Sequence, residues 1–213
     1  MKNNYTEPNL KSSAIIIIDM QNDFVLPKAI AEIKGSYALQ DNLVTLLNQA
    51  RISRVPIIHV IRLYEEDGSN VDLCRKSVVQ SGHKIVTPFS EGAEILDALT
   101  PPKTFLDFPL LLKGEFQQCG DQEWIMYKPR WGAFYKTDLE TFLRERQVDT
   151  LIFGGCNFPN CPRTSIYEAS ERDFKIILAR DAMSQLYAKG LEEMANIEVK
   201  LMSTAELVKA YQE

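Results

Sequence analysis

The chain has 213 residues, a length that a single α/β domain commonly reaches, and 45% of them are hydrophobic, which is enough for a large core. Its net charge is −5 and its basic residues are scattered, so neither a nucleic acid nor a membrane surface is an expected partner. The polar opening MKNNYTEPNLKSS lacks the apolar stretch of a signal peptide or membrane span, and we predict a cytoplasmic protein.

Continuous apolar runs alternate along the chain with stretches of helical periodicity. The first run, AIIII before Asp19, has no polar alternation, which is typical of a parallel strand buried on both faces. Apolar residues at helical spacing follow within residues 39–50. Six such runs are predicted as strands, at residues 14–19, 55–61, 123–128, 150–155, 174–179 and 198–202.

Helices are expected between most of these strands, including one that begins near Cys161 and a last one after Ser203. Strands that alternate with helices predict a three-layer α/β/α fold of the Rossmann-like kind, with right-handed crossovers. We therefore predict that residues 1–213 form one domain around a six-stranded, mostly parallel sheet.

Residues 63–122 depart from this alternation. They contain the turn clusters EEDGSN, TPFSEG and LTPPKT, with short helices expected between them. Their apolar content is too low for a separate core, and their length exceeds that of ordinary loops. We expect an elaborated connection within the domain that serves as a lid or a subunit contact, and we predict a homodimer or homotetramer.

The cysteines and histidines do not form a metal-binding pattern. The four cysteines are Cys74, Cys119, Cys156 and Cys161. The spacing of the last pair fits no zinc ribbon, and there is no second pair to complete four ligands. His59 and His83 are the only histidines, and His59 lies within a predicted strand, where a satisfied core residue is expected. We expect reduced thiols, no bound metal and no other cofactor.

Three reactive side chains stand where predicted strands end: Asp19 after the first, Lys128 after the third, and Cys161 in the turn after the fourth. Open parallel sheets bind ligands beyond the carboxyl ends of their strands, so these groups are expected to converge. Taken singly, Asp19 also fits a loop cap, Lys128 a solvated strand end and Cys161 a small hydrophobe. The combination favours a site.

The chemistry of the three groups is complementary. A thiol reacts as its thiolate, and a helix N-terminus at Cys161 stabilises that anion. Asp19 is suited to remove the thiol proton as a general base. Lys128 is suited to hold the carboxylate and to polarise a small-molecule substrate, so no histidine is required.

The turn GGCNFPNCP supplies the backbone for this chemistry. Gly154 and Gly155 permit close approach of other main chain, and Pro162 suits the first turn of a helix because it has no N–H to leave unpaired. The prolines of the turn cannot donate hydrogen bonds. The amides of Asn157 and Cys161 are therefore the expected donors to a developing oxyanion.

With these motifs in order, the chain resembles the isochorismatase-like cysteine hydrolase superfamily, which includes nicotinamidases and N-carbamoylsarcosine amidohydrolases. The resemblance covers almost the whole chain and rests on IIIIDMQNDF, YKPRWGAFYKTDLETFLRE and VDTLIFGGCNFPNCPRTSIYEASERDFKIILARDAMS. It implies a six-stranded parallel sheet, dimers or tetramers, and an Asp–Lys–Cys triad, here Asp19, Lys128 and Cys161. It also implies a cis peptide bond at Cys156–Asn157, which aims the oxyanion-hole amides of Asn157 and Cys161.

Some positions depart from the family pattern. Phe158 stands where the family usually has threonine, and Pro162 where it has a small apolar residue, so the turn is expected to differ in shape. The Asp-x-His-x-x-His metal site of nicotinamidases has no counterpart in HVIRLYEEDGSN, which disfavours nicotinamidase activity. Siderophore-type isochorismatases generally lack the cysteine, so Cys161 disfavours vinyl-ether cleavage. The resemblance thus implies hydrolysis of a small amide, ureido or carbamoyl C–N bond through an acyl-enzyme.

Three residues are candidates for substrate binding. Phe24 resembles the aromatic residue that lines the family pocket, with core packing as the alternative, and Trp131 is a candidate second wall. Arg62, just past the second predicted strand, is a candidate clamp for a substrate carboxylate, although a solvated arginine is the favoured interpretation. Weaker candidates of the same kind are Arg75, Arg130 and Arg163.

Other functions remain open at this point. The altered turn NFPNCP is compatible with a non-catalytic member that binds a small ligand or a protein, and hydrolysis of a different bond is a further alternative. A thiol redox protein that uses Cys156 and Cys161 is a third. It is disfavoured because the C-x-x-C pattern is missing and the turn suits a disulfide poorly.

Overall fold

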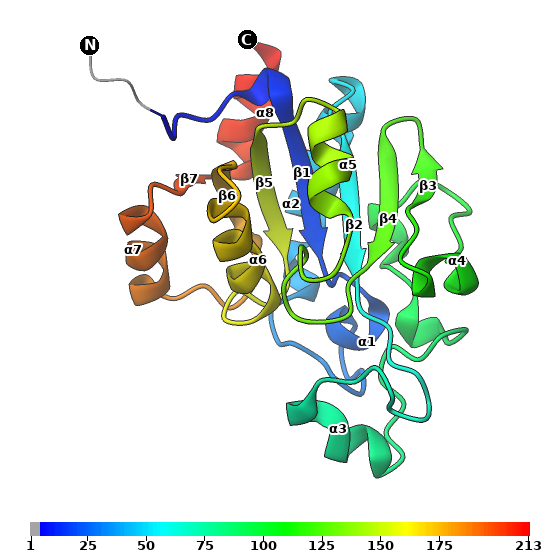
Figure 1. Ribbon diagram of the computed structural model, residues 1–213. Coiled ribbons are helices and arrows are strands. Elements are labelled where there is room, and N and C mark those ends of the chain that lie inside the picture. Colours follow the sequence, from blue (N-terminus) through cyan, green and yellow to red (C-terminus); the bar gives the residue numbers. More distant parts are fainter. Residues whose placement is uncertain (1–4) are drawn as a thin grey trace.

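A computed structural model describes residues 5–213 as one sheet covered on both faces by helices (Figure 1). Within those residues the sheet has seven strands in the order β3-β4-β2-β1-β5-β6-β7. Their bounds are β1 Ser13–Ile18, β2 Ile57–Ile61, β3 Gln117–Gly120, β4 Glu123–Tyr127, β5 Thr150–Gly155, β6 Lys175–Met183 and β7 Lys200–Met202.

Six of these strands are the predicted ones and run parallel to one another, but the prediction of a six-stranded sheet was wrong by one. The additional strand is β3, a short segment of sequence QQCG that pairs antiparallel with β4 at the edge of the sheet. It lacks an apolar run because it is only partly buried, so hydrophobic patterning did not reveal it.

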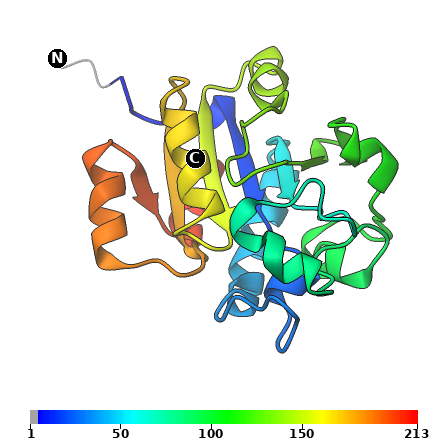
Figure 2. The ribbon, with the colours of Figure 1, turned by 60° about the horizontal axis from the view of Figure 1, so that its bottom comes forward.

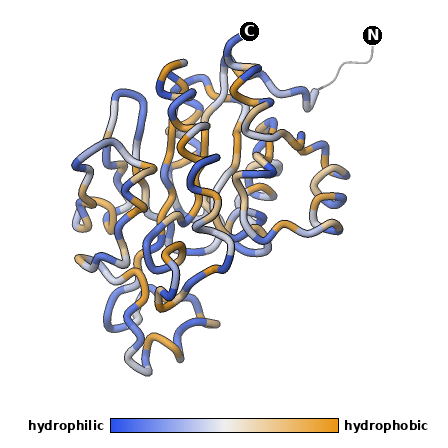
Figure 3. Tube along the Cα trace, turned by 180° about the vertical axis from the view of Figure 1, so that it is seen from behind, coloured by the Kyte–Doolittle hydropathy of each residue, from blue (hydrophilic) through white to orange (hydrophobic). Residues whose placement is uncertain are grey.

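Two apolar cores lie on opposite faces of the sheet, as the alternation of side chains along each strand requires. On β1, Ile15 and Ile17 pack towards α2 and α8, whereas Ile16 and Ile18 pack towards α5, α6 and α7. These layers are visible in Figure 1, and the hydrophobic colour in Figure 3 follows the central strands. The five helices are α2 Gln40–Ile52, α5 Leu139–Glu145, α6 Cys161–Ser170, α7 Ala188–Asn196 and α8 Thr204–Gln212.

The segment after β2 crosses the carboxyl edge of the sheet before it returns to the edge strands. Figures 1 and 2 both place helix α3 beyond the ends of the central strands. The helices of this segment are α3 Leu73–Gln80, α4 Phe108–Leu112 and the 3₁₀ turns η3 Glu91–Ala93 and η4 Asp97–Leu99. Helix α1 Asn22–Val25 follows β1, and the 3₁₀ turns η1 Leu10–Ser12 and η2 Tyr37–Leu39 lie elsewhere. No helix within residues 5–213 is long and apolar enough to span a membrane.

One buried glutamine fixes this segment to the sheet. Gln21 follows β1, and its side-chain Nε2 donates to the carbonyl oxygens of Arg62 at 2.8 Å and Ala93 at 2.7 Å. Its Oε1 accepts a hydrogen bond from the Arg62 amide at 2.8 Å. Because Gln21 is fully buried, these bonds satisfy main-chain groups that water cannot reach.

Candidate active site

Asp19 and Lys128 form a buried ion pair at the carboxyl edge of the sheet. Asp19 directly follows β1 and Lys128 directly follows β4, and Lys128 Nζ donates to Asp19 Oδ2 at 3.0 Å. The Lys128 side chain is completely buried and that of Asp19 is 6% exposed. Moving two charges from water into the protein interior costs free energy, and the attraction between them offsets this cost. Loss of either partner would leave an unpaired buried charge and destabilise the fold.

The second carboxylate oxygen of Asp19 is free. Asp19 Oδ1 is buried and has no hydrogen-bond partner among residues 5–213. Buried polar atoms are nearly always paired, so an orphaned carboxylate oxygen is an unusual feature. It leaves an acceptor available at the place where the thiol of Cys161 lies, at the N-terminus of α6 and in the same hollow as Asp19.

The surroundings of the Cys161 thiol disfavour its thiolate form. Burial and the negative charge of Asp19 raise the pKa of Cys161 to about 12, although Lys128 acts in the opposite direction. A nucleophilic Cys161 would therefore depend on transfer of its proton to a neighbouring base.

The turn between β5 and α6 brings the main chain close to β1. The peptide bond Cys156–Asn157 is cis, and Gly155 has a φ of 113°. A Cβ at Gly155 would lie 2.2 Å from the Ile18 carbonyl oxygen, so no side chain fits there. Cys156 is fully buried and its Sγ donates to the Asp19 carbonyl oxygen at 3.0 Å.

Two backbone amides of this turn are available to a ligand. The amide of Phe158 donates to the Ser184 carbonyl, and that of Asn160 to the Asn157 carbonyl. In contrast, the amides of Asn157 and Cys161 have no acceptor among the described residues. Free amides beside a nucleophile are the arrangement that stabilises negative charge on a carbonyl oxygen.

Asp19 and Cys161 line a hollow with a cavity volume of about 20 Å³. Phe24 and Trp131, both candidates from the sequence, line it as well, and Phe24 is otherwise buried. This cavity volume is close to that of a single water molecule, so the hollow is narrow in this structure. The hollow thus brings together the predicted Asp19, Cys161, Phe24, Trp131 and Asn157.

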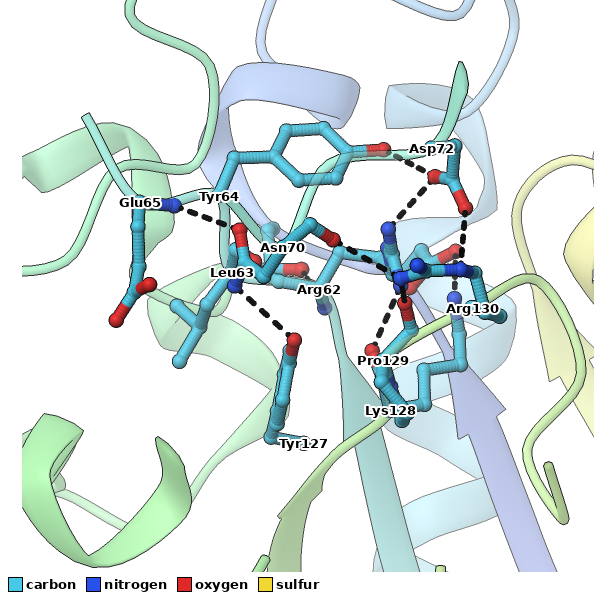
Figure 4. A network of polar contacts seen from close by, with 12 residues as sticks. Arg62, Leu63, Tyr64, Glu65, Asn70, Asp72, Tyr127, Lys128, Pro129 and Arg130 are labelled. Atoms are coloured by element: carbon cyan, nitrogen blue, oxygen red, sulfur yellow. Dashed lines mark hydrogen bonds and ion pairs between the residues drawn. The ribbon is translucent and has the colours of Figure 1, made fainter. Parts of the chain in front are cut away.

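Arg62 also lines the hollow, but the expectation of a solvated arginine was wrong. It is 2% exposed, and its Nη2 donates to Asp72 Oδ2 at 2.6 Å while Nη1 donates to the Lys128 carbonyl oxygen at 2.8 Å (Figure 4). Its guanidinium lies 4.8 Å from the ring centroid of Tyr64, whose hydroxyl donates to Asp72 Oδ2 at 3.0 Å. Arg62 therefore fixes the position of the Lys128 main chain.

The sequence analysis did not identify Asp72, Tyr64 or Gln21 as part of this site. Asp72 and Tyr64 lie in the turn-rich region after β2, where no periodic pattern marks an inward-facing side chain. Gln21 stands two residues after Asp19 in the motif IIIIDMQNDF. This closeness to Asp19 was the one sequence feature that could have indicated that Gln21 belongs to the site.

The candidate His59 lies outside the hollow. His59 is buried and its Nε2 contacts Glu123 Oε1 at 2.7 Å, but its Nδ1 has no hydrogen-bond partner among residues 5–213, so the expectation of a satisfied core histidine is met only in part. Glu123 is also held by Arg51 through two hydrogen bonds of 2.8 and 2.9 Å. All four cysteines are free thiols, and no three His, Cys, Asp or Glu side chains within residues 5–213 are grouped to hold a metal.

Comparison with known proteins gives consistent matches. Residues 13–206 match the family described as the isochorismatase domain. A probable inactive nicotinamidase of Arabidopsis thaliana is 27% identical over 197 residues, covering 89% of this chain and 91% of that protein. The ureidoacrylate amidohydrolase RutB of Methylobacterium radiotolerans is 24% identical, covering 86% and 72%. A solved isochorismatase family protein from Desulfovibrio vulgaris matches with a TM-score of 0.80 at 28% identity, over 95% of this chain and 99% of that one.

Proposed function

This chain belongs to the isochorismatase family, and on that premise we propose that it is a cysteine-dependent hydrolase of a small amide, ureido or carbamoyl C–N bond. One observation carries the proposal: Asp19 holds Lys128 through Oδ2, and its free Oδ1 lies in the same hollow as the thiol of Cys161. This is a nucleophile with an adjacent base and a third group that orients the base.

In the first step the substrate carbonyl enters the hollow with its oxygen towards the amides of Asn157 and Cys161. The Cys161 sulfur attacks the carbonyl carbon while its proton passes to Asp19 Oδ1. The two amides stabilise the negative charge on the oxygen of the tetrahedral intermediate. Asp19 then returns the proton to the nitrogen, the C–N bond breaks, and ammonia or an amine leaves.

In the second step water releases the acyl group from Cys161. Asp19, again ionised, takes a proton from the water as its oxygen attacks the thioester carbon. The C–S bond breaks and the proton returns to the sulfur, which restores the starting state. Lys128 donates to Asp19 Oδ2 and so orients the carboxylate in both steps.

The named relatives support the bond class without fixing the substrate. RutB of Methylobacterium radiotolerans is named for hydrolysis of ureidoacrylate, which has the ureido C–N bond that the proposed mechanism cleaves. The Arabidopsis relative is named a probable inactive nicotinamidase, and this favours one alternative, a non-catalytic member that only binds its ligand.

A screen for ammonia release from small amides, carbamoyl compounds and ureido acids tests the proposal. Release should depend on Cys161, so Cys161→Ala should abolish it while ligand binding persists. Intact-protein mass spectrometry of the wild-type protein under turnover should show an acyl adduct on the peptide that contains Cys161. Ammonia release that survives in Cys161→Ala would exclude the cysteine mechanism, and binding without release by the wild type would favour the non-catalytic alternative.

A further inference from the structure

Arg75 has an unusual position among the charged residues around the hollow. It lies in the first turn of α3 and lines the hollow together with Cys161. Its side chain has no hydrogen bond or ion pair with any residue in the described range 5–213. It is only partly exposed, so this guanidinium lies at a ligand site without an opposite charge.

The other charges of the hollow compensate one another. Lys128 is paired with Asp19 at 3.0 Å, and Arg62 with Asp72 at 2.6 Å. Both pairs are buried, so neither cation can leave its partner for a ligand without leaving a buried carboxylate unpaired. Arg75 thus gives the hollow an excess of one positive charge.

The two other arginines that the sequence suggested are already engaged. Arg130 donates to the carbonyl oxygens of Asn70 and Pro129, at 3.0 and 2.6 Å. Arg163 pairs with Glu193 at 2.5 Å. Among the four candidate arginines in the described chain, Arg75 is the one whose donors are free.

We propose that the substrate carries a carboxylate at the end remote from the bond that is cleaved, and that Arg75 binds it and determines specificity. This inference rests on the proposed function and narrows the substrate class to small amido, ureido or carbamoyl acids. A guanidinium presents paired donors that match a carboxylate, and partial burial strengthens the contact relative to one in open water.

The inference can be tested before the substrate is known, with two alkylating probes that differ only in charge. N-(iodoacetyl)-β-alanine carries a carboxylate, and N-(iodoacetyl)-β-alaninamide carries a neutral amide of the same shape. The rate of alkylation at Cys161 is followed by peptide mapping for both probes. Each rate is divided by the rate with N-acetylcysteine methylamide, a free thiol that corrects for intrinsic reactivity.

In the wild type the acid should react at Cys161 about tenfold faster, relative to the amide, than it does with the free thiol, since a charge-assisted hydrogen bond contributes about that factor. Arg75→Gln should remove the preference, and Arg75→Lys, which keeps the charge but loses the paired donors, should retain only part of it. Lys76→Gln, which removes a neighbouring charge of α3 that does not line the hollow, should leave it unchanged. Thermal unfolding of each variant verifies that the fold is intact.

An acid-to-amide ratio that is equal in the wild type and in Arg75→Gln would overturn the inference. The same holds if Lys76→Gln lowers the ratio as much as Arg75→Gln, because the preference would then reflect general charge on α3. Neither result would contradict the proposed function. That function is tested separately, by ammonia release from the wild type and the loss of this release in Cys161→Ala.

Discussion

Replacing Asp19 with asparagine separates two opposite effects of the carboxylate on Cys161. Its negative charge, together with burial, raises the pKa of Cys161 to about 12, yet its free Oδ1 is the proposed proton acceptor. The Asp19→Asn change keeps the shape and removes both the charge and the base. We therefore expect the thiol to ionise more easily while turnover is lost.

The size of both effects follows from the arrangement. Burial is the larger cause of the raised pKa and remains, whereas loss of the Asp19 charge should lower the pKa of Cys161 by roughly one to two units. Lys128, freed from its partner, acts in the same direction. At pH 9 the thiolate fraction should then rise by roughly tenfold or more. Turnover should fall by a factor of about 10² to 10⁴, the usual contribution of a general base.

The assay combines two measurements on the same protein. Alkylation of Cys161 by iodoacetamide is measured between about pH 7 and 10.5, a range around the reference thiol pKa of about 8.5. Ammonia release is measured with any substrate that the screen identifies. Asp67→Asn, an equal change of charge at an exposed residue, is the control and should alter neither quantity. If Asp19→Asn alkylates no faster than the wild type at pH 9, the carboxylate is not what raises the thiol pKa. If it also keeps its turnover, Asp19 is not the base.

The other predictions concern stability and assembly. Lys128→Met leaves Asp19 with an unpaired buried charge and should cost about 3 to 5 kcal/mol in urea unfolding, whereas Lys84→Met, in an exposed ion pair, should cost less than about 1 kcal/mol. Gly155→Ala should destabilise by at least about 3 kcal/mol, because its Cβ would collide with backbone of β1, whereas Gly114→Ala, also at positive φ but with no atom within 4 Å, should cost about 1 to 2 kcal/mol. A similar cost for both glycines would contradict the close-approach argument. Sedimentation at micromolar concentration should show a homodimer or homotetramer, and a monomer would contradict that expectation.

The parts of the site that the sequence predicts are those fixed by regular geometry. An unbroken run of isoleucines identifies β1 as a buried parallel strand, and in a parallel sheet the residues after such strands meet at one edge. This is why Asp19 and Lys128 could be paired although they are 109 positions apart. The same logic extends to Cys161, which follows β5 through a short turn.

The parts that the sequence does not reveal depend on irregular backbone. Strand β3 is partly exposed and polar, and it is ordered by main-chain hydrogen bonds to β4, which leave no apolar signature. The Arg62–Asp72 pair spans a turn-rich segment without a fixed period, so spacing cannot predict it. The burial of Arg62 depends on how α3 and the residue before it, Asp72, pack against the carboxyl edge of the sheet.

The Arg62 guanidinium links the helix that carries Arg75 to the lysine beside the proposed base. One of its nitrogens holds the main chain at Lys128, and another holds Asp72, the residue that precedes α3. A displacement of α3 is therefore transmitted through two short hydrogen bonds to the Lys128–Asp19 pair. The proposed anion site on α3 and the catalytic charges are therefore joined by a continuous chain of hydrogen bonds. Substitutions on α3 that never touch the substrate should for this reason alter the rate of the chemical step as well as affinity.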